Sequence, residues 1–177
     1  MVPAGFTAYF TATATAAGAL IGLLFVAVSL RSETIFGENA TARGRANAGS
    51  AFTALVNAFF VSLVALIPQA GIGDVSITMA IVSLFATVRL HREVARQHVQ
   101  FGMLVYSLAV VVLQFVNGIL VQLYQHNVNY VDIAAFVIIG QVSGALSRAW
   151  SLVEGRHLAE VAQAADRAAA PGDSSAP

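Results

Sequence analysis

The stretch Phe101-Gly-Met-Leu-Val-Tyr-Ser-Leu-Ala-Val-Val-Val-Leu-Gln-Phe-Val-Asn-Gly-Ile-Leu-Val-Gln-Leu-Tyr124 contains no charged residue along 24 consecutive positions. An α-helix needs about 20 such residues to cross roughly 30 Å of hydrocarbon. Four further apolar runs have a similar character and lie at about residues 4–30, 51–67, 75–90 and 133–152. The whole chain is 58% hydrophobic and 10% charged, whereas soluble domains are about a quarter charged. The sequence therefore predicts an all-α polytopic membrane protein with a bundle of five transmembrane helices.

The basic residues of the chain predict which ends of these helices face the cytoplasm. All nine are arginines and lie in alternate gaps between the runs or near the run ends that border them, as Arg31, Arg43, Arg45, Arg89, Arg92, Arg96, Arg148, Arg156 and Arg167. The other gaps contain no Lys or Arg, and their only charged residues are Asp74 and Asp132. Because short cytoplasmic loops are enriched in Lys and Arg, we expect the N-terminus outside and the C-terminus in the cytoplasm.

The domain organisation follows from the same runs. We expect residues 1–153 to form the transmembrane domain and residues 154–177 a cytoplasmic tail that is first helical and then disordered. The second and third runs are short, and the link between them, residues 68–74, contains a proline, two glycines and Asp74, which are signals of a tight turn before a helix. Residues 51–90 could thus form either a hairpin that spans the membrane or a re-entrant one. We favour the spanning hairpin.

The sequence contains no pattern typical of catalysis, cofactor binding or metal binding. There is no cysteine, and His91 and His98 lack the spacing of a zinc-binding helix motif. The membrane runs contain no acid, base and nucleophile that could act together. We therefore expect a protein that is not an enzyme and that has no cofactor, no metal site and no nucleic-acid partner.

Polar residues inside the apolar runs are the candidate functional residues, because amides and charges in hydrocarbon need partners. They follow helical spacing, which predicts polar stripes, and the candidates are Asn57, Gln114, Asn117, Gln141 and Arg148. In one interpretation the amides hydrogen-bond between helices of the bundle. In the other they line a hydrated path at the centre of an oligomer. Arg148 either extends to the membrane interface or binds an anion or closes a pore.

Small residues at intervals of four predict close helix contacts. The pattern occurs at Ala14, Gly18 and Gly22 in the first run, and at Gly140 and Gly144 in the fifth. These contacts could be made within one chain or between subunits.

The stretch Leu20-Ile-Gly-Leu-Leu-Phe-Val-Ala-Val-Ser-Leu30, together with residues 51–68, resembles a group of small, uncharacterised bacterial integral membrane proteins. The resemblance covers the first third of the chain and implies a bacterial inner membrane, without an activity or a site. With the lipid bilayer as its surroundings, the chain is expected to be a homo-oligomeric pore or binder for an ion or small polar solute. The alternative is an accessory or scaffold subunit that binds another membrane protein.

Overall fold

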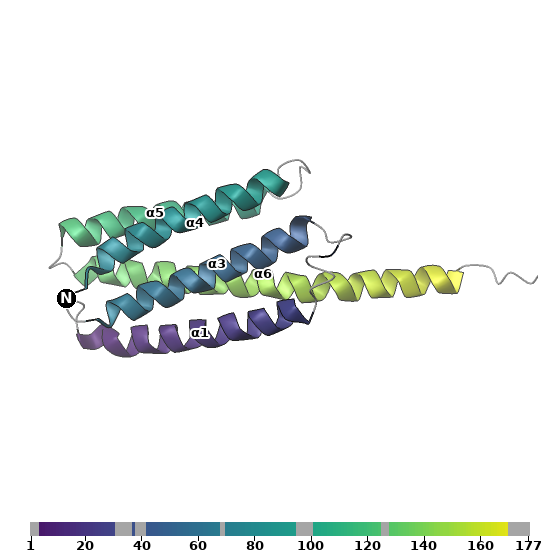
Figure 1. The fold of residues 1–177 in the computed structure, drawn as a ribbon, viewed down its shortest axis with the longest axis horizontal. Coiled ribbons are helices and arrows are strands. Elements are labelled where there is room, and N and C mark those ends of the chain that lie inside the picture. Colours follow the sequence, from purple (N-terminus) through teal and green to yellow (C-terminus); the bar gives the residue numbers. More distant parts are fainter. Residues whose placement is uncertain are drawn as a thin grey trace, which may run out of the picture.

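The computed structural model describes residues 4–30, 37, 42–67, 70–94, 101–124 and 128–169 (Figure 1). After a short 3-10 helix, Ala4–Phe6, the elements are five α-helices: α1 (Thr7–Ser29), α3 (Ala42–Ala65), α4 (Ile72–Val94), α5 (Phe101–Leu123) and α6 (Val128–Ala169). Each contains a stretch long and apolar enough to cross a membrane. The prediction of an all-helical chain with five such helices is confirmed.

Four of the helices form a closed ring in which α3 packs on α4, α4 on α5, α5 on α6 and α6 on α3. The remaining helix, α1, lies outside this ring against α3. Within its most apolar stretch, α3 has 44% of its residues buried, whereas α1 has 17%. The four helices of the ring therefore surround a common axis, and α1 packs against the ring from outside (Figure 1).

Two apolar clusters hold α1 and α6 against α3. One contains Phe10, Ala58, Val61 and Ile138, and the other contains Leu24, Ala51, Leu55 and Ala145. At the end of α1 near the N-terminus, the Tyr9 hydroxyl also donates a 2.7 Å hydrogen bond to the Ala135 carbonyl of α6. Many other large apolar side chains lie on the outside of the bundle, which is the pattern expected of helices that face lipid.

The two charged ends expected from the sequence are opposite ends of the bundle. The described arginines Arg45, Arg89 and Arg92 lie at the end where α1 and α4 finish and α3 begins, and α6 extends beyond the bundle at this same end (Figure 1). At the opposite end, Asp74 lies in the first turn of α4 and Asp132 is the fifth residue of α6. We call these the arginine end and the aspartate end.

The helix limits differ from the expected ones where polar residues begin a helix. α3 starts at Ala42 rather than at residue 51, and α6 starts at Val128 rather than at residue 133. In α3 the early polar residues are accommodated because Asn47, which is buried, donates a 3.1 Å hydrogen bond to the Ser151 hydroxyl of α6. Since that partner lies about a hundred residues further along the chain, composition alone indicated a loop.

The hairpin of α3 and α4 has the length needed for a full crossing. The apolar stretches Gly44–Ala65 and Ile72–Leu90 contain 22 and 19 residues, about 33 and 29 Å at 1.5 Å per residue. Between them, Leu66 and Ala70 donate backbone hydrogen bonds to carbonyls three residues back. α6 continues without interruption to Ala169, so the tail begins as the expected helix. The segment expected to be disordered lies outside the described residues.

Candidate functional site

The centre of the four-helix bundle contains a cluster of hydrogen-bonded amides. Asn57 of α3 and Gln114 of α5 form a reciprocal pair, in which each side-chain amide donates to the carbonyl oxygen of the other at 2.9 Å. Gln141 of α6 donates to the same Gln114 Oε1. From α4, the Ser83 hydroxyl accepts a 2.9 Å bond from Asn57, and the Ser76 carbonyl accepts one of 3.3 Å from Gln114. The cluster therefore joins all four helices of the ring.

These amides face the interior of a single chain. Asn57, Gln114 and Gln141 are 1%, 5% and 5% exposed, so they are absent from the outer surface of the bundle. Their geometry agrees with the interpretation in which polar stripes hydrogen-bond between helices. A path along these amides would run through one bundle, and the centre of an oligomer would be lined by other residues.

Three buried polar atoms have no hydrogen-bond partner within the described part of the chain. They are Gln141 Oε1 in the amide cluster, Asn117 Oδ1 one turn further along α5, and Ser62 Oγ in α3. Asn117 is buried as the stripe predicts, but the amide cluster does not include it. An unpaired buried acceptor costs about 1–3 kcal/mol, so these atoms retain capacity to bind a polar group.

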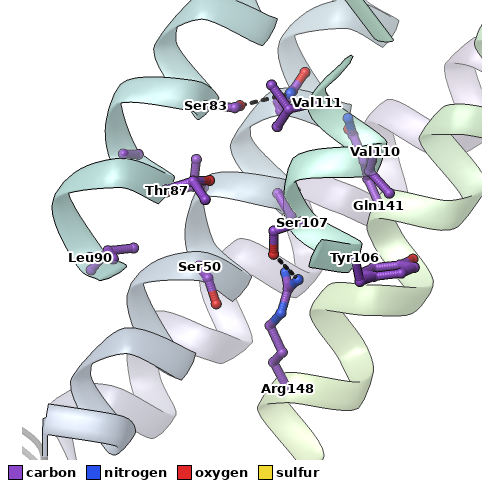
Figure 2. Close-up of a pocket in the computed structure, with 14 residues that line it drawn as sticks. Ser50, Ser83, Thr87, Leu90, Tyr106, Ser107, Val110, Val111, Gln141 and Arg148 are labelled. Atoms are coloured by element: carbon purple, nitrogen blue, oxygen red, sulfur yellow. Dashed lines mark hydrogen bonds between the residues drawn. The ribbon is translucent and has the colours of Figure 1, made fainter. Parts of the chain in front are cut away.

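A cavity of about 40 Å³ extends from the amide cluster toward the arginine end. Its walls come from α3, α4, α5 and α6 (Figure 2). Most of its polar wall groups are uncharged, and the polar residues that line it are Ser50, Thr53, Asn57, Ser83, Thr87, Tyr106, Ser107, Gln141 and Arg148. Since a cavity needs about 10–15 Å³ for each water molecule, this one has room for about three.

Arg148 supplies the positive charge of this cavity. Its side chain is 8% exposed and points from α6 into the bundle, where Nη2 donates a 2.6 Å hydrogen bond to Ser107 Oγ of α5 (Figure 2). Its Cζ atom lies 5.8 Å from the centre of the Tyr106 ring, within cation–π range. The side chain therefore contacts a neighbouring helix inside the bundle.

Within the described residues, the positive charge of Arg148 is not paired with a negative charge. Among the residues that the structure describes, no carboxylate forms an ion pair with this guanidinium, and the Ser107 hydroxyl that accepts its hydrogen bond is neutral. Arg148 lies three residues before the end of the apolar stretch Val128–Ser151, so its burial costs less than the roughly 2.5–3.5 kcal/mol of an arginine at a helix centre. Because its contacts are one neutral hydroxyl and one aromatic ring, its positive charge favours a negative group in the cavity.

Gly140 and Gly144 of α6 pack against the side chain of Tyr106. A Cβ atom on Gly144 would lie 3.0 Å from Tyr106 Cε1, and the Tyr106 hydroxyl donates a 2.9 Å bond to the Gly140 carbonyl. The small-residue motif is therefore an internal contact, in which an aromatic ring rather than a second helix backbone fills the groove. The ring in turn lies beside Arg148 at the cavity wall (Figure 2).

Glycines of α1, α4 and α5 differ in how closely other helices approach them. Gly18 lies against the Phe59 ring of α3, whereas Gly22 is exposed, and a Cβ atom added to it would have no neighbour within 4 Å. Helices α4 and α5 approach each other closely at Gly73 and Gly118, where a Cβ atom on Gly73 would lie 2.8 Å from the Gly118 carbonyl oxygen. This contact was not expected, because each helix contributes a single glycine.

Several residues that line the cavity were not predicted as candidates from the sequence. Ser83 and Tyr106 were not candidates, although Ser76 and Ser83 are seven residues apart and therefore share a face of α4. Serine and tyrosine are common in membrane helices, and serine often bonds to its own helix, which makes such a signal weak.

The arrangement offers hydrogen bonds and one positive charge. Among the described residues no group of three or more His, Asp or Glu side chains could hold a metal ion. No known protein family, curated protein or solved structure matches this chain. The function is accordingly inferred from the chemistry of the cavity.

Proposed function

We propose that this chain is an integral membrane protein of the bacterial inner membrane that binds an ion or small polar solute inside its helical bundle. The observation that carries the proposal is the polar cavity, which combines the amide cluster with the buried Arg148 in an otherwise apolar bundle. Buried polar groups in membrane helices are costly and usually mark a path or binding site for a solute. Because the amides lie inside one chain, we place the path within each bundle even if several copies associate.

The proposed orientation sets the direction from which the solute enters. With the N-terminus outside and the C-terminus in the cytoplasm, the arginine end is cytoplasmic. The cavity lies on that side of the amide cluster, so the cytoplasm is the source of the solute. The amide cluster, which fills the cross-section of the ring with direct hydrogen bonds, is then the barrier to further movement.

The test compares two variants, in each of which one alanine is replaced by leucine, after the purified protein has been reconstituted in liposomes. Ala86 lines the cavity and Ala16 lies on the exposed face of α1. Ala86→Leu adds three carbons to a space of about 40 Å³, so we expect binding or flux of the responsive solute to fall at least tenfold. Ala16→Leu should leave both unchanged. A wild-type protein that is folded and inert toward a broad panel of ions and small solutes would overturn the proposal.

A second candidate function is that of an accessory subunit that binds another membrane protein. It is favoured by the outer face of α1, where Thr7, Thr11, Thr15 and Gly22 are exposed and small enough for a partner helix to approach closely. Purification in a mild detergent separates the two candidates. A stoichiometric foreign partner that is lost with Gly22→Leu supports the accessory role, and a homo-oligomer without such a partner argues against it.

A further inference from the structure

We propose that the solute is a small monovalent anion and that Arg148 with Ser107 forms its binding site. This inference rests on the function proposed above and specifies its ligand. Among the described residues, those that line the cavity include one charged side chain, Arg148, and no acid. A guanidinium stays protonated at any physiological pH, so the charge of the wall is fixed. The site therefore attracts anions and repels cations.

The hydrogen-bond donors at this end of the cavity also suit an anion. Arg148 has five N–H donors, and its bond to Ser107 uses Nη2 alone. Ser107 Oγ accepts that bond, so its own proton is directed elsewhere. Two other wall hydroxyls are already committed to backbone carbonyls, Ser50 to Asn47 and Thr53 to Gly49. Arg148 and Ser107 thus both have N–H or O–H groups left that can donate to an anion. Figure 2 shows the hydrogen bond that joins the two side chains.

The shape of the surroundings keeps the guanidinium at this position. Tyr106 lies beside Arg148, and its hydroxyl is bonded to the Gly140 carbonyl, so the ring closes one side of the site. On the helix of Arg148 itself, the Ser151 hydroxyl donates a 2.8 Å bond to the Arg148 carbonyl. The side chain is 8% exposed, which means that it faces the cavity rather than the lipid or water outside.

The volume limits the size of the ligand. A space of about 40 Å³ accommodates about three water-sized groups, so ions of one to about four non-hydrogen atoms fit. Chloride, formate and nitrate are within this limit, whereas gluconate is too large. The amide end of the cavity adds an unpaired acceptor, Gln141 Oε1, which places the negative ligand at the arginine end.

The test measures anion binding to the full chain in lipid nanodiscs by titration calorimetry and by thermal unfolding. The probes are sodium chloride, formate and nitrate, compared with sodium gluconate at equal ionic strength, and urea serves as the neutral probe. We expect the three small anions to bind and to raise the unfolding temperature. Arg148→Gln should weaken binding at least tenfold and Ser107→Ala severalfold. Arg89→Gln, which removes a charge from an exposed position at the same end, should have no effect.

The outcomes separate this inference from the function on which it depends. Binding of urea or sodium ion without binding of small anions overturns the anion site and leaves a solute-binding protein. Anion binding that is equally strong in Arg148→Gln and Arg89→Gln overturns the assignment to Arg148. A folded wild-type protein that binds none of the probes overturns both proposals. If Arg148→Gln does not fold, Ser107→Ala decides, and wild-type affinity in that variant contradicts the site.

Discussion

The amide cluster should be a principal source of stability in this bundle, and Gln114→Leu is the substitution that tests it. Gln114 accepts hydrogen bonds from Asn57 and Gln141 and donates to Asn57 and to the Ser76 carbonyl. Leucine has a similar volume and no polar atoms, so the change removes these bonds with little change in packing. It leaves Asn57 Oδ1 and Gln141 Nε2 buried without their partners, whereas Asn57 Nδ2 keeps Ser83.

The expected loss follows from the number of bonds. Hydrogen bonds between membrane helices contribute about 0.6 kcal/mol on average and up to about 1.7 kcal/mol. Three neighbouring residues lose a contact and two buried polar groups lose their partners, each at a cost of about 1 kcal/mol or more. The free energy of unfolding should therefore fall by about 2–4 kcal/mol. The double substitution with Asn57→Leu should cost less than the sum of the single ones, with a coupling of about 1 kcal/mol.

The assay is equilibrium unfolding in mixed micelles with an increasing fraction of denaturing detergent, followed by circular dichroism and by the fluorescence of Trp150, the one tryptophan of the chain. The control is Gln122→Leu, the same substitution at an exposed position of α5, which should change stability by less than about 0.5 kcal/mol. Equal effects of the two substitutions, or strict additivity of Asn57→Leu and Gln114→Leu, would refute the reasoning.

Three further predictions concern the helix contacts and the orientation. Gly118→Ala places a Cβ atom 2.9 Å from Ile77 Cγ1 and should cost about 1–3 kcal/mol in the same unfolding assay. Gly22→Ala meets nothing within 4 Å and should be neutral or stabilising by up to about 1 kcal/mol, so the reverse order contradicts the structure. Gly144→Ala should cost more than Tyr106→Phe, because the added Cβ atom would lie 3.0 Å from Tyr106 Cε1 and forces the ring to shift, whereas Tyr106→Phe removes one hydrogen bond; a smaller cost would argue against this packing contact. A reporter that is active only in the periplasm, fused after the last residue, should stay inactive, and activity would reverse the proposed orientation.

The number and nature of the helices could be predicted from sequence because membrane length and apolar run length are tied by simple geometry. A run such as 101–124 has few alternatives, since its backbone groups must bond internally in hydrocarbon. The helix limits were less predictable. Polar residues at the start of α3 indicate a loop by composition, yet Asn47 is buried against α6. That partner is distant in sequence, and only the fold reveals it.

The residues of the site were predictable in kind but not in their connections. Helical spacing placed Gln114 and Asn117 on one stripe, and both are buried. Spacing does not say which of them meets Asn57, because this depends on how far two helices are shifted along each other. The contact of Gly73 with Gly118 could not be predicted either. It joins one glycine from each of two helices, and neither glycine belongs to a small-residue motif.

The shift between α5 and α6 explains why Arg148 faces the interior. In α5, Ser107 lies seven residues before Gln114, and in α6, Arg148 lies seven residues after Gln141; seven residues are about two helical turns. Because the two helices are antiparallel, the same displacement leads from one contact to the other. Once Gln141 bonds to Gln114, Arg148 must reach the level of Ser107, as observed. The direction of this arginine is therefore fixed by the amide cluster, and a substitution that rotates α6 at Gln141 should also move the charge out of the cavity.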